Sequence, residues 1–142
     1  MATKPDDVPT LLARAARSHR TLSASLLAPL GLHPGQDALL RCLWTTDGQT
    51  QSDLVEQLGV EAPTVTKMVH RLEAGGFVRR RPHPTDRRAT QVWLTASGRA
   101  IRSDVQKVRT RINRRLLGGL SPRQQATLVS LLGKVDANLG DD

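Results

Sequence analysis

Aromatic residues are almost missing from this 142-residue chain, which has one Phe, two Trp and no Tyr. A core with so few rings has to be built mostly from Leu, Val and Ala, a composition that favours helices. The single cysteine, Cys42, cannot form an intramolecular disulfide, so nothing indicates an oxidising compartment. No run approaches the roughly 18 apolar residues of a membrane span, and residues 1–7 do not resemble a signal peptide. We therefore expect a cytoplasmic protein without membrane contact.

Motifs of the common enzyme classes are also missing. The chain has no Gly-x-Ser-x-Gly, no His-Glu-x-x-His, no P-loop and no dinucleotide-binding fingerprint. Its four histidines show no metal-ligand spacing, and one cysteine cannot form a Cys-x-x-Cys pair. We expect a protein that is not an enzyme and has no catalytic residues, no metal and no cofactor.

Positive charge is abundant and unevenly distributed. The formal net charge is +8, and the segment from Lys67 to Arg115 holds fourteen Lys and Arg against three Asp and Glu. The other residues hold seven Lys and Arg against ten acidic residues. Segregated positive charge is typical of a protein that binds a polyanion, but a soluble protein with a general basic bias would look similar. Charge alone leaves these two interpretations about even.

Two short helices joined by a tight turn are predicted in the middle of the chain. The first, 51–58, should begin at the N-cap Thr50, with Asp53 as the partner of a capping box, and should end at Gly59. The second, 62–74, should end at a glycine pair. Its core-facing positions are Val65, Met68, Val69 and Leu72. Two helices with such a turn are typical of a helix-turn-helix.

A β-hairpin is predicted directly after the second helix. Residues 77–81 and 90–94 have the composition of strands, and in the latter Val92 and Leu94 alternate with less apolar neighbours. The connecting loop, 82–89, contains two prolines and two arginines. A hairpin with a positively charged tip beside a helix-turn-helix is a wing. Together with the charge distribution, it favours nucleic acid as the partner.

Longer helices are expected towards both ends of the sequence. The first should start near Pro9, and a short, largely apolar helix follows over 35–45. After the wing, Thr95 should cap one continuous helix that reaches about Leu117, and Ser121 should cap the last helix. The apolar stripes of the long and last helices are too extensive for so small a winged domain to cover. We therefore expect them to pack against the same helices of a second copy.

Several short motifs are spread over residues 26–101. They are Leu30-Gly31-Leu32-His33-Pro34-Gly35-Gln36, Leu58-Gly59-Val60, Thr64-Val65-Thr66-Lys67-Met68-Val69, Arg71-Leu72-Glu73, Gly75-Gly76-Phe77-Val78, Asp86-Arg87-Arg88-Ala89 and Leu94-Thr95-Ala96-Ser97-Gly98. Together they resemble the MarR (multiple antibiotic resistance regulator) family, and the Asp-x-Arg wing followed by Leu-Thr-x-x-Gly is the most specific part. One departure is Glu61, where the family commonly has Ser. The resemblance implies a winged helix-turn-helix regulator that dimerises through its first and last helices.

The second helix of the motif is the expected recognition helix, whose outer face enters the major groove. The residues of that face are Pro63, Thr64, Thr66, Lys67, His70 and Arg71. Threonine methyls can contact thymine methyls, and lysine can donate to guanine O6 and N7. We expect His70 at a phosphate or a base and Arg71 at a phosphate. Thr50 and Gln51, at the start of the first helix, are expected at the DNA backbone.

Five wing residues are expected to serve DNA binding. They are Arg79, Arg81, Asp86, Arg87 and Arg88. A hairpin beside a recognition helix reaches the adjacent minor groove, where narrow A·T-rich segments attract arginine. The resemblance implies that Arg88, the Arg of Asp-x-Arg, is the one that inserts. We expect Asp86 to hold its guanidinium by a charge-assisted hydrogen bond, and Arg87 to contact phosphate.

The predicted fold class is mainly α within α+β, a winged helix-turn-helix with a two-stranded wing. We interpret 1–142 as one MarR-type domain, with dimerisation helices in 9–30 and 96–139 and a DNA-binding lobe in 35–95. The expected function is that of a homodimeric repressor of transcription. It should bind a palindromic double-stranded DNA operator and be released by a small aromatic or phenolic effector.

The effector pocket is predicted near His19, Leu22, His33 and Trp44, where polar and aromatic residues interrupt apolar faces. Two alternatives to this function stay open. One is an architectural protein that binds double-stranded nucleic acid without an effector. The other is a thiol-based sensor that uses Cys42, which would require an exposed thiol; the opposing interpretation is a small hydrophobic residue of the core.

Overall fold

The computed structural model describes residue 4 and residues 7–140. Most of the segment compared with a signal peptide, residues 1–7, therefore lies outside the described residues. The chain divides into two compact units, one ending at Arg109 and one beginning at Thr110. Among the described residues, no helix combines the length and the apolar character needed to cross a membrane.

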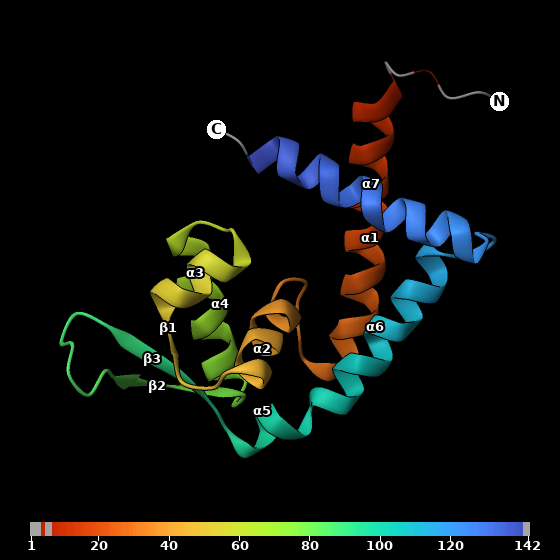
Figure 1. Ribbon diagram of the computed structural model, residues 1–142. Coiled ribbons are helices and arrows are strands. Elements are labelled where there is room, and N and C mark those ends of the chain that lie inside the picture. The colour runs from red at the N-terminus through yellow and green to blue at the C-terminus, as the bar shows by residue number, and fades with distance from the viewer. Residues whose placement is uncertain (1–3, 5–6, 141–142) are drawn as a thin grey trace. The chain divides into compact units, whose positions relative to one another are not determined.

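Helices make up most of both units (Figure 1). The first unit contains α1 (Val8–Leu27), a short 3-10 helix η2 (Ala28–Leu30), α2 (Gln36–Thr45), α3 (Gln51–Leu58), α4 (Ala62–Ala74), α5 (Ala96–Ala100) and the first half of α6 (Arg102–Leu116). The second unit contains the end of α6 and α7 (Pro122–Gly140). The predicted helix-turn-helix is confirmed as α3 and α4, and its bounds are those expected from the sequence.

A small antiparallel sheet accompanies these helices. It consists of β1 (Gln49–Thr50), β2 (Val78–Pro82) and β3 (Thr90–Leu94) in the order β1-β3-β2. The hairpin of β2 and β3 is the predicted wing, but the sheet has three strands, not two. The additional strand was not predicted because two residues are too few to show a period-2 pattern.

The core of the winged lobe is almost entirely Leu and Val, as the shortage of aromatic residues predicts. Its most deeply buried side chains are Leu39, Leu40 and Leu43 of α2, Leu54 of α3, Val65, Val69 and Leu72 of α4, and Val78 and Val92 of the sheet. Met68, the fourth core-facing position predicted on α4, is half-buried. Burial of this shared core fixes α4 relative to the wing.

Local capping explains where the helices of the motif begin and end. The Thr50 hydroxyl accepts from the Asp53 main-chain N–H at 3.1 Å, and the Asp53 carboxylate accepts from the Thr50 N–H at 3.1 Å. This is the predicted capping box. Gly59 ends α3 with φ of 63°, a left-handed conformation that glycine adopts without a Cβ clash.

The Leu-Thr-x-x-Gly motif joins the base of the wing to the following helix. Thr95 donates its main-chain N–H to the carbonyl of Phe77 at 3.0 Å. Its side chain caps α5 by accepting from the N–H of Gly98 at 3.1 Å, as predicted. The carbonyl of Gly98 in turn accepts from the indole N–H of Trp44 at 2.9 Å. These bonds fix the first turn after the wing to α2 and to Phe77 at the base of the wing.

The single long helix predicted from Thr95 to about Leu117 is interrupted. α5 ends at Ala100, Ile101 adopts ψ of −10°, and α6 begins at Arg102. The first turn is fixed to the base of the wing, so the chain changes direction where this constraint ends. The apolar spacing continues across the interruption, and for this reason the sequence pattern did not reveal it.

Candidate nucleic-acid interface

The outer face of α4 is exposed as predicted. All six residues expected there lie at the surface, namely Pro63, Thr64, Thr66, Lys67, His70 and Arg71. The Thr66 hydroxyl donates back to the Ala62 carbonyl at 3.1 Å. Glu61 is the N-cap residue, but its side chain makes no capping hydrogen bond. The helix therefore presents short polar side chains near its N-terminus and cationic or imidazole groups further along.

The wing tip is organised by a histidine that sequence reasoning did not assign to the site. The hairpin extends beyond the helices of its unit (Figure 1). At its tip, the Nδ1 atom of His83 accepts from the main-chain N–H groups of Asp86 at 3.0 Å and Thr85 at 3.2 Å. The Nδ1 atom of His83 thus acts as an acceptor, and the ring supports the turn. Only the tertiary structure shows that this half-buried ring faces the loop backbone.

Asp86 shapes the same turn. Instead of the predicted bond to the guanidinium of Arg88, its Oδ1 atom accepts from the main-chain N–H of Arg88 at 3.0 Å. The physical reason is the short side chain of Asp, which reaches the backbone two residues further on and forms an Asx turn. The side chains of Arg87 and Arg88 are both exposed at this tip.

Arg80 connects the wing to the recognition helix. Its main-chain N–H and its Nε atom each donate to the carboxylate of Glu73 at 3.0 Å, and its Nη1 atom lies 2.9 Å from Nε2 of His70. Strand residues alternate between faces, so Arg80 shares the α4-facing side of β2 with the buried Val78. Arg79 and Arg81, which the sequence analysis assigned to DNA, lie on the opposite side and are exposed.

This contact changes the titration of Glu73. The main-chain N–H of Arg80 above all, and then its guanidinium, hold the pKa of the Glu73 carboxyl below its ordinary value. A carboxyl with a lowered pKa in the folded state stabilises the fold above its ordinary pKa. That contribution is lost as the pH falls through the lowered pKa. At neutral pH the connection between α4 and β2 is therefore an ion pair.

Comparison with known proteins identifies this arrangement. The sequence profile of the MarR family matches residues 32–90. The chain is 30% identical to wild-type MarR from E. coli in its apo form, with a TM-score of 0.75, and the match covers 94% of this chain and 98% of that protein. The chain belongs to the MarR family. It is a transcriptional regulator, in agreement with the prediction that it is not an enzyme.

Other relatives include a protein in complex with DNA, a protein regulated by a small molecule and an uncharacterised regulator. A mutant of E. coli MarR in complex with operator DNA is 28% identical, with a TM-score of 0.83, and the match covers 94% of this chain and 99% of that protein. BpsR from Bordetella bronchiseptica, whose DNA binding is regulated by 6-hydroxynicotinic acid, is 28% identical, with a TM-score of 0.83 and coverage of 92% and 98%. An uncharacterised regulator of the helix-turn-helix type, YdgJ from Bacillus subtilis, is 28% identical over 123 residues, which are 87% of this chain and 75% of YdgJ.

Thr50 and Gln51, expected at the DNA backbone, lie where β1 passes into α3. The Thr50 hydroxyl is committed to the cap of α3. Gln51 is half-buried at the first position of that helix. The winged helix of this MarR-family chain thus uses one of these residues structurally, and their contact with DNA stays a prediction.

The four residues of the predicted effector pocket have separate surroundings. His19 is exposed on α1, with its Nε2 atom 3.4 Å from the Ser23 hydroxyl, and Leu22 is half-buried on the same helix. His33 is exposed in the loop before α2, and Trp44 is half-buried and donates to Gly98. Their joint role in binding an effector stays a prediction.

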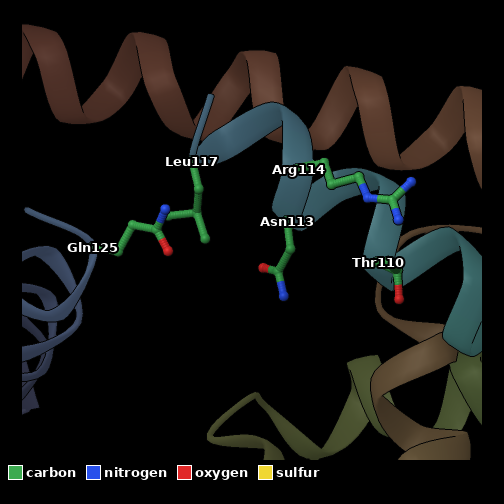
Figure 2. Close-up of a pocket in the computed structure, with 5 residues that line it drawn as sticks. All are labelled: Thr110, Asn113, Arg114, Leu117 and Gln125. Carbon is green, nitrogen blue, oxygen red and sulfur yellow. The ribbon is translucent and has the colours of Figure 1, made fainter. Parts of the chain in front are cut away.

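The second unit contains a hollow that sequence analysis did not single out. It has a volume of about 380 Å³ and lies between the end of α6 and the start of α7. Figure 2 shows the residues that line it, Thr110, Asn113, Arg114, Leu117 and Gln125. The lining offers one guanidinium, two amides, one hydroxyl and one apolar side chain. No motif marks these residues, because two separate helices supply them.

Cys42 does not have the surroundings of a reactive thiol. The residue is half-buried on α2. Burial raises the pKa of its thiol, and the neighbouring guanidinium of Arg41 offsets only part of that effect. Since the thiolate is the reactive form, a raised pKa argues against the redox-sensing alternative and favours a packing role. Among the described residues, no three His, Cys, Asp or Glu side chains cluster as metal ligands would.

Proposed function

We propose that this MarR-family protein binds double-stranded DNA sequence-specifically, as a homodimer that represses transcription. The observation that carries this proposal is the rigid pairing of an exposed helix face with an arginine-tipped hairpin. Arg80 joins the two through Glu73 and His70. A helix and a hairpin fixed to each other can enter a major groove and the adjacent minor groove together. The operator complex of E. coli MarR supports the same role for this chain.

Contacts in the major groove follow from the exposed face of α4. Because the Thr66 hydroxyl donates back into the helix, its methyl group is the part suited to a thymine methyl. Lys67, one residue on, donates to guanine O6 or N7, and Arg71 near the end of α4 contacts phosphate. The exposed Glu61 at the N-terminus of α4 would repel a phosphate there, and we assign Thr50 and Gln51 at the start of α3 to the DNA backbone.

The wing supplies the minor-groove contact. Arg87 and Arg88 lie within a turn that Asp86 and His83 stabilise by hydrogen bonds to the backbone. A turn stabilised in this way presents its cationic side chains with little loss of backbone entropy on binding. We assign Arg88 to the minor groove and Arg87 to phosphate. Arg79 and Arg81 on the outer side of β2 add phosphate contacts.

Replacement of Arg88 tests this assignment. Arg88→Ala should weaken operator binding by roughly 1–3 kcal/mol, flatten the preference for flanking A·T pairs and reduce the salt slope by about one. The measurement is operator affinity across a salt titration, with operators that differ only in the flanking pairs. Arg87→Ala is the matched control, since loss of a phosphate contact should weaken all sequences alike. Parental behaviour of Arg88→Ala would mean that the wing is only a structural hairpin.

Apolar side chains on the terminal helices support the homodimer. Seven large apolar residues along α1 and α7 are 41% to 71% exposed in the isolated chain: Val8, Leu11, Leu12, Val129, Leu131, Leu132 and Leu139. Scattered exposed leucines are common, but repeated ones along a helix mark an interface. A second copy is the partner we propose. Two-fold symmetry would then repeat the winged lobe on a second DNA half-site.

A two-fold protein should read a two-fold site. We expect a binding selection to recover a pseudo-palindrome whose half-sites are about 10 bp apart, centre to centre. Footprinting on that operator should show both half-sites protected in one cooperative step. Protection of a single asymmetric half-site by one protomer would contradict the proposal. A flat sequence preference would instead indicate an architectural protein.

Release by a small ligand is the regulatory part of the proposal, and the regulation of BpsR by 6-hydroxynicotinic acid supports it. That compound is a suitable aromatic carboxylate probe. If the effector binds where the sequence predicts, the fluorescence of Trp44 in a Trp93→Phe variant should change over the concentrations that release DNA. Release that leaves Trp44 unaffected but is abolished by Arg114→Gln would place the effector in the hollow beside α7. Failure of a broad aromatic carboxylate panel to release DNA would exclude this effector class.

A further inference from the structure

Three side chains from two elements meet on the side of the winged lobe that carries the exposed face of α4. His70 and Glu73 come from α4, one turn apart, and Arg80 comes from β2. Arg80 uses all three of its side-chain nitrogens: Nε donates to Glu73 Oε1 at 3.0 Å, Nη2 lies 3.0 Å from the same oxygen, and Nη1 lies 2.9 Å from His70 Nε2. These contacts use three of the five N–H groups of the guanidinium, so most of its hydrogen-bonding capacity is directed at Glu73 and His70. We call these residues the His70–Glu73–Arg80 cluster.

The contact between Arg80 and His70 determines which nitrogen of the imidazole ring carries the proton in the neutral form. A guanidinium has only donors, so Nε2 of His70 has to be the acceptor of this hydrogen bond. An accepting ring nitrogen carries no proton. The neutral ring then carries its single proton on Nδ1, which leaves an N–H donor on a side chain that is exposed on the outer face of α4.

We propose that His70 is a specificity-determining residue, which Arg80 holds in the Nδ1–H form so that it donates to an acceptor on a base edge in the major groove. The proposal rests on the DNA binding proposed above. Guanine N7 and O6, adenine N7 and thymine O4 are acceptors in the major groove, whereas cytosine offers the N4 amino donor there. A fixed donor therefore disfavours cytosine at the contacted position. Arg80 is a positioning residue that acts through His70, not a phosphate contact.

Glu73 sets the geometry of the cluster. It accepts from both the main-chain N–H and the side chain of Arg80, so the guanidinium is fixed at two points before it meets His70. The side chains of Arg80 and Glu73 are 38% and 34% exposed. Water can therefore replace their contacts in a variant without unfolding the lobe. Substitution here should change recognition more than stability.

The first test determines the tautomer of the His70 ring directly and needs no DNA. In the full-length protein labelled with ¹⁵N-histidine, two-bond ¹H–¹⁵N correlation spectra distinguish a protonated Nδ1 from a protonated Nε2. We expect His70 to carry its proton on Nδ1, and to lose this preference in Arg80→Lys, whose compact ammonium lacks the planar array of donors. A proton on Nε2 in the parent protein, or an unchanged tautomer in the variant, would overturn the proposal.

The second test reads base preference. Arg80→Lys keeps the charge, so a phosphate contact would survive it, whereas a positioning role would not. We expect about fivefold less discrimination at one base pair of each half-site, the worth of about one hydrogen bond, with an unchanged salt slope. Arg123→Lys on α7 makes the same substitution away from the lobe and should leave the preference unchanged.

Variants of His70 itself complete the test. His70→Asn retains an amide donor near the position of Nδ1 and should keep part of the preference, whereas His70→Phe should lose it. Equal base preference for parent, His70→Phe and Arg80→Lys on an operator that the parent selects would overturn the role of His70. If the parent selects no sequence at all, the proposed DNA-binding function fails, while the spectra still report on the tautomer.

Discussion

A chain that ends at Gly118 should sediment as a monomer and lose roughly 10²–10⁴-fold in operator affinity, the contribution expected from linking two binding modules. The truncation removes all of α7, where Val129 and Leu139 are 70% and 71% exposed in the isolated chain. The fold of a single chain does not explain why apolar residues as exposed as these recur along α7. Burial of their apolar surface against a second copy would supply the free energy of dimerisation.

The loss of affinity would come from geometry. Each winged lobe would keep its own contacts, because the first unit ends at Arg109 and the truncation leaves it whole. Two monomers, however, bind the two half-sites in independent events, whereas a dimer binds both half-sites in one event. Analytical ultracentrifugation gives the oligomeric state, and titration of a full operator against a half-site gives the coupling.

Point variants test the same interface in a full-length chain, in case the truncated chain does not fold. Leu132→Asp puts a charge on an apolar residue of α7 that is 50% exposed, and Ser130→Asp puts the same charge on an exposed polar neighbour. Leu132→Asp should shift the equilibrium towards monomer, whereas Ser130→Asp should affect it less. A stable dimer in both the truncated chain and Leu132→Asp would show that the interface lies elsewhere.

The features that the sequence predicted correctly are those that neighbouring residues determine. Thr50 with Asp53 forms the expected capping box, and Ser121, the expected cap of the last helix, forms another with Gln124, because each bond spans only three residues. The outer face of α4 was equally predictable, since helical periodicity places the apolar residues inward. The strands of the wing followed from their composition and alternation.

The features that the sequence did not predict depend on residues far apart in the chain. The interruption of the long helix at Ile101 reflects the attachment of Gly98 to Trp44 and to the base of the wing. The sequence alone does not distinguish Arg80 from its arginine neighbours. Only the position of β2 beside α4 brings it to His70. Periodicity shows which face a residue lies on but not which partner meets it there.

The second large effect should come from Gly98, the glycine of the Leu-Thr-x-x-Gly motif. A Cβ at this position would lie 2.0 Å from the carbonyl oxygen of Phe77, a backbone atom that cannot rotate away. That oxygen already accepts the main-chain N–H of Thr95. Gly98→Ala therefore has to displace the start of α5 from the base of the wing and strain or break the bonds of Thr95 and Trp44.

We expect Gly98→Ala to lower the free energy of unfolding by about 3 kcal/mol, towards the upper end for overpacking, and the melting temperature by roughly 10 °C. The matched control is Gly118→Ala, where the nearest atom to an added Cβ is the Arg114 carbonyl at 3.5 Å, an ordinary contact. Chemical denaturation of both variants beside the parent measures the difference. Because the displaced segment positions the wing, Gly98→Ala should also weaken operator binding at temperatures where it stays folded. If the two variants were equally stable, the junction between the base of the wing and α5 would accommodate the added methyl group without loss of stability. The presence of glycine in the motif would then need another explanation.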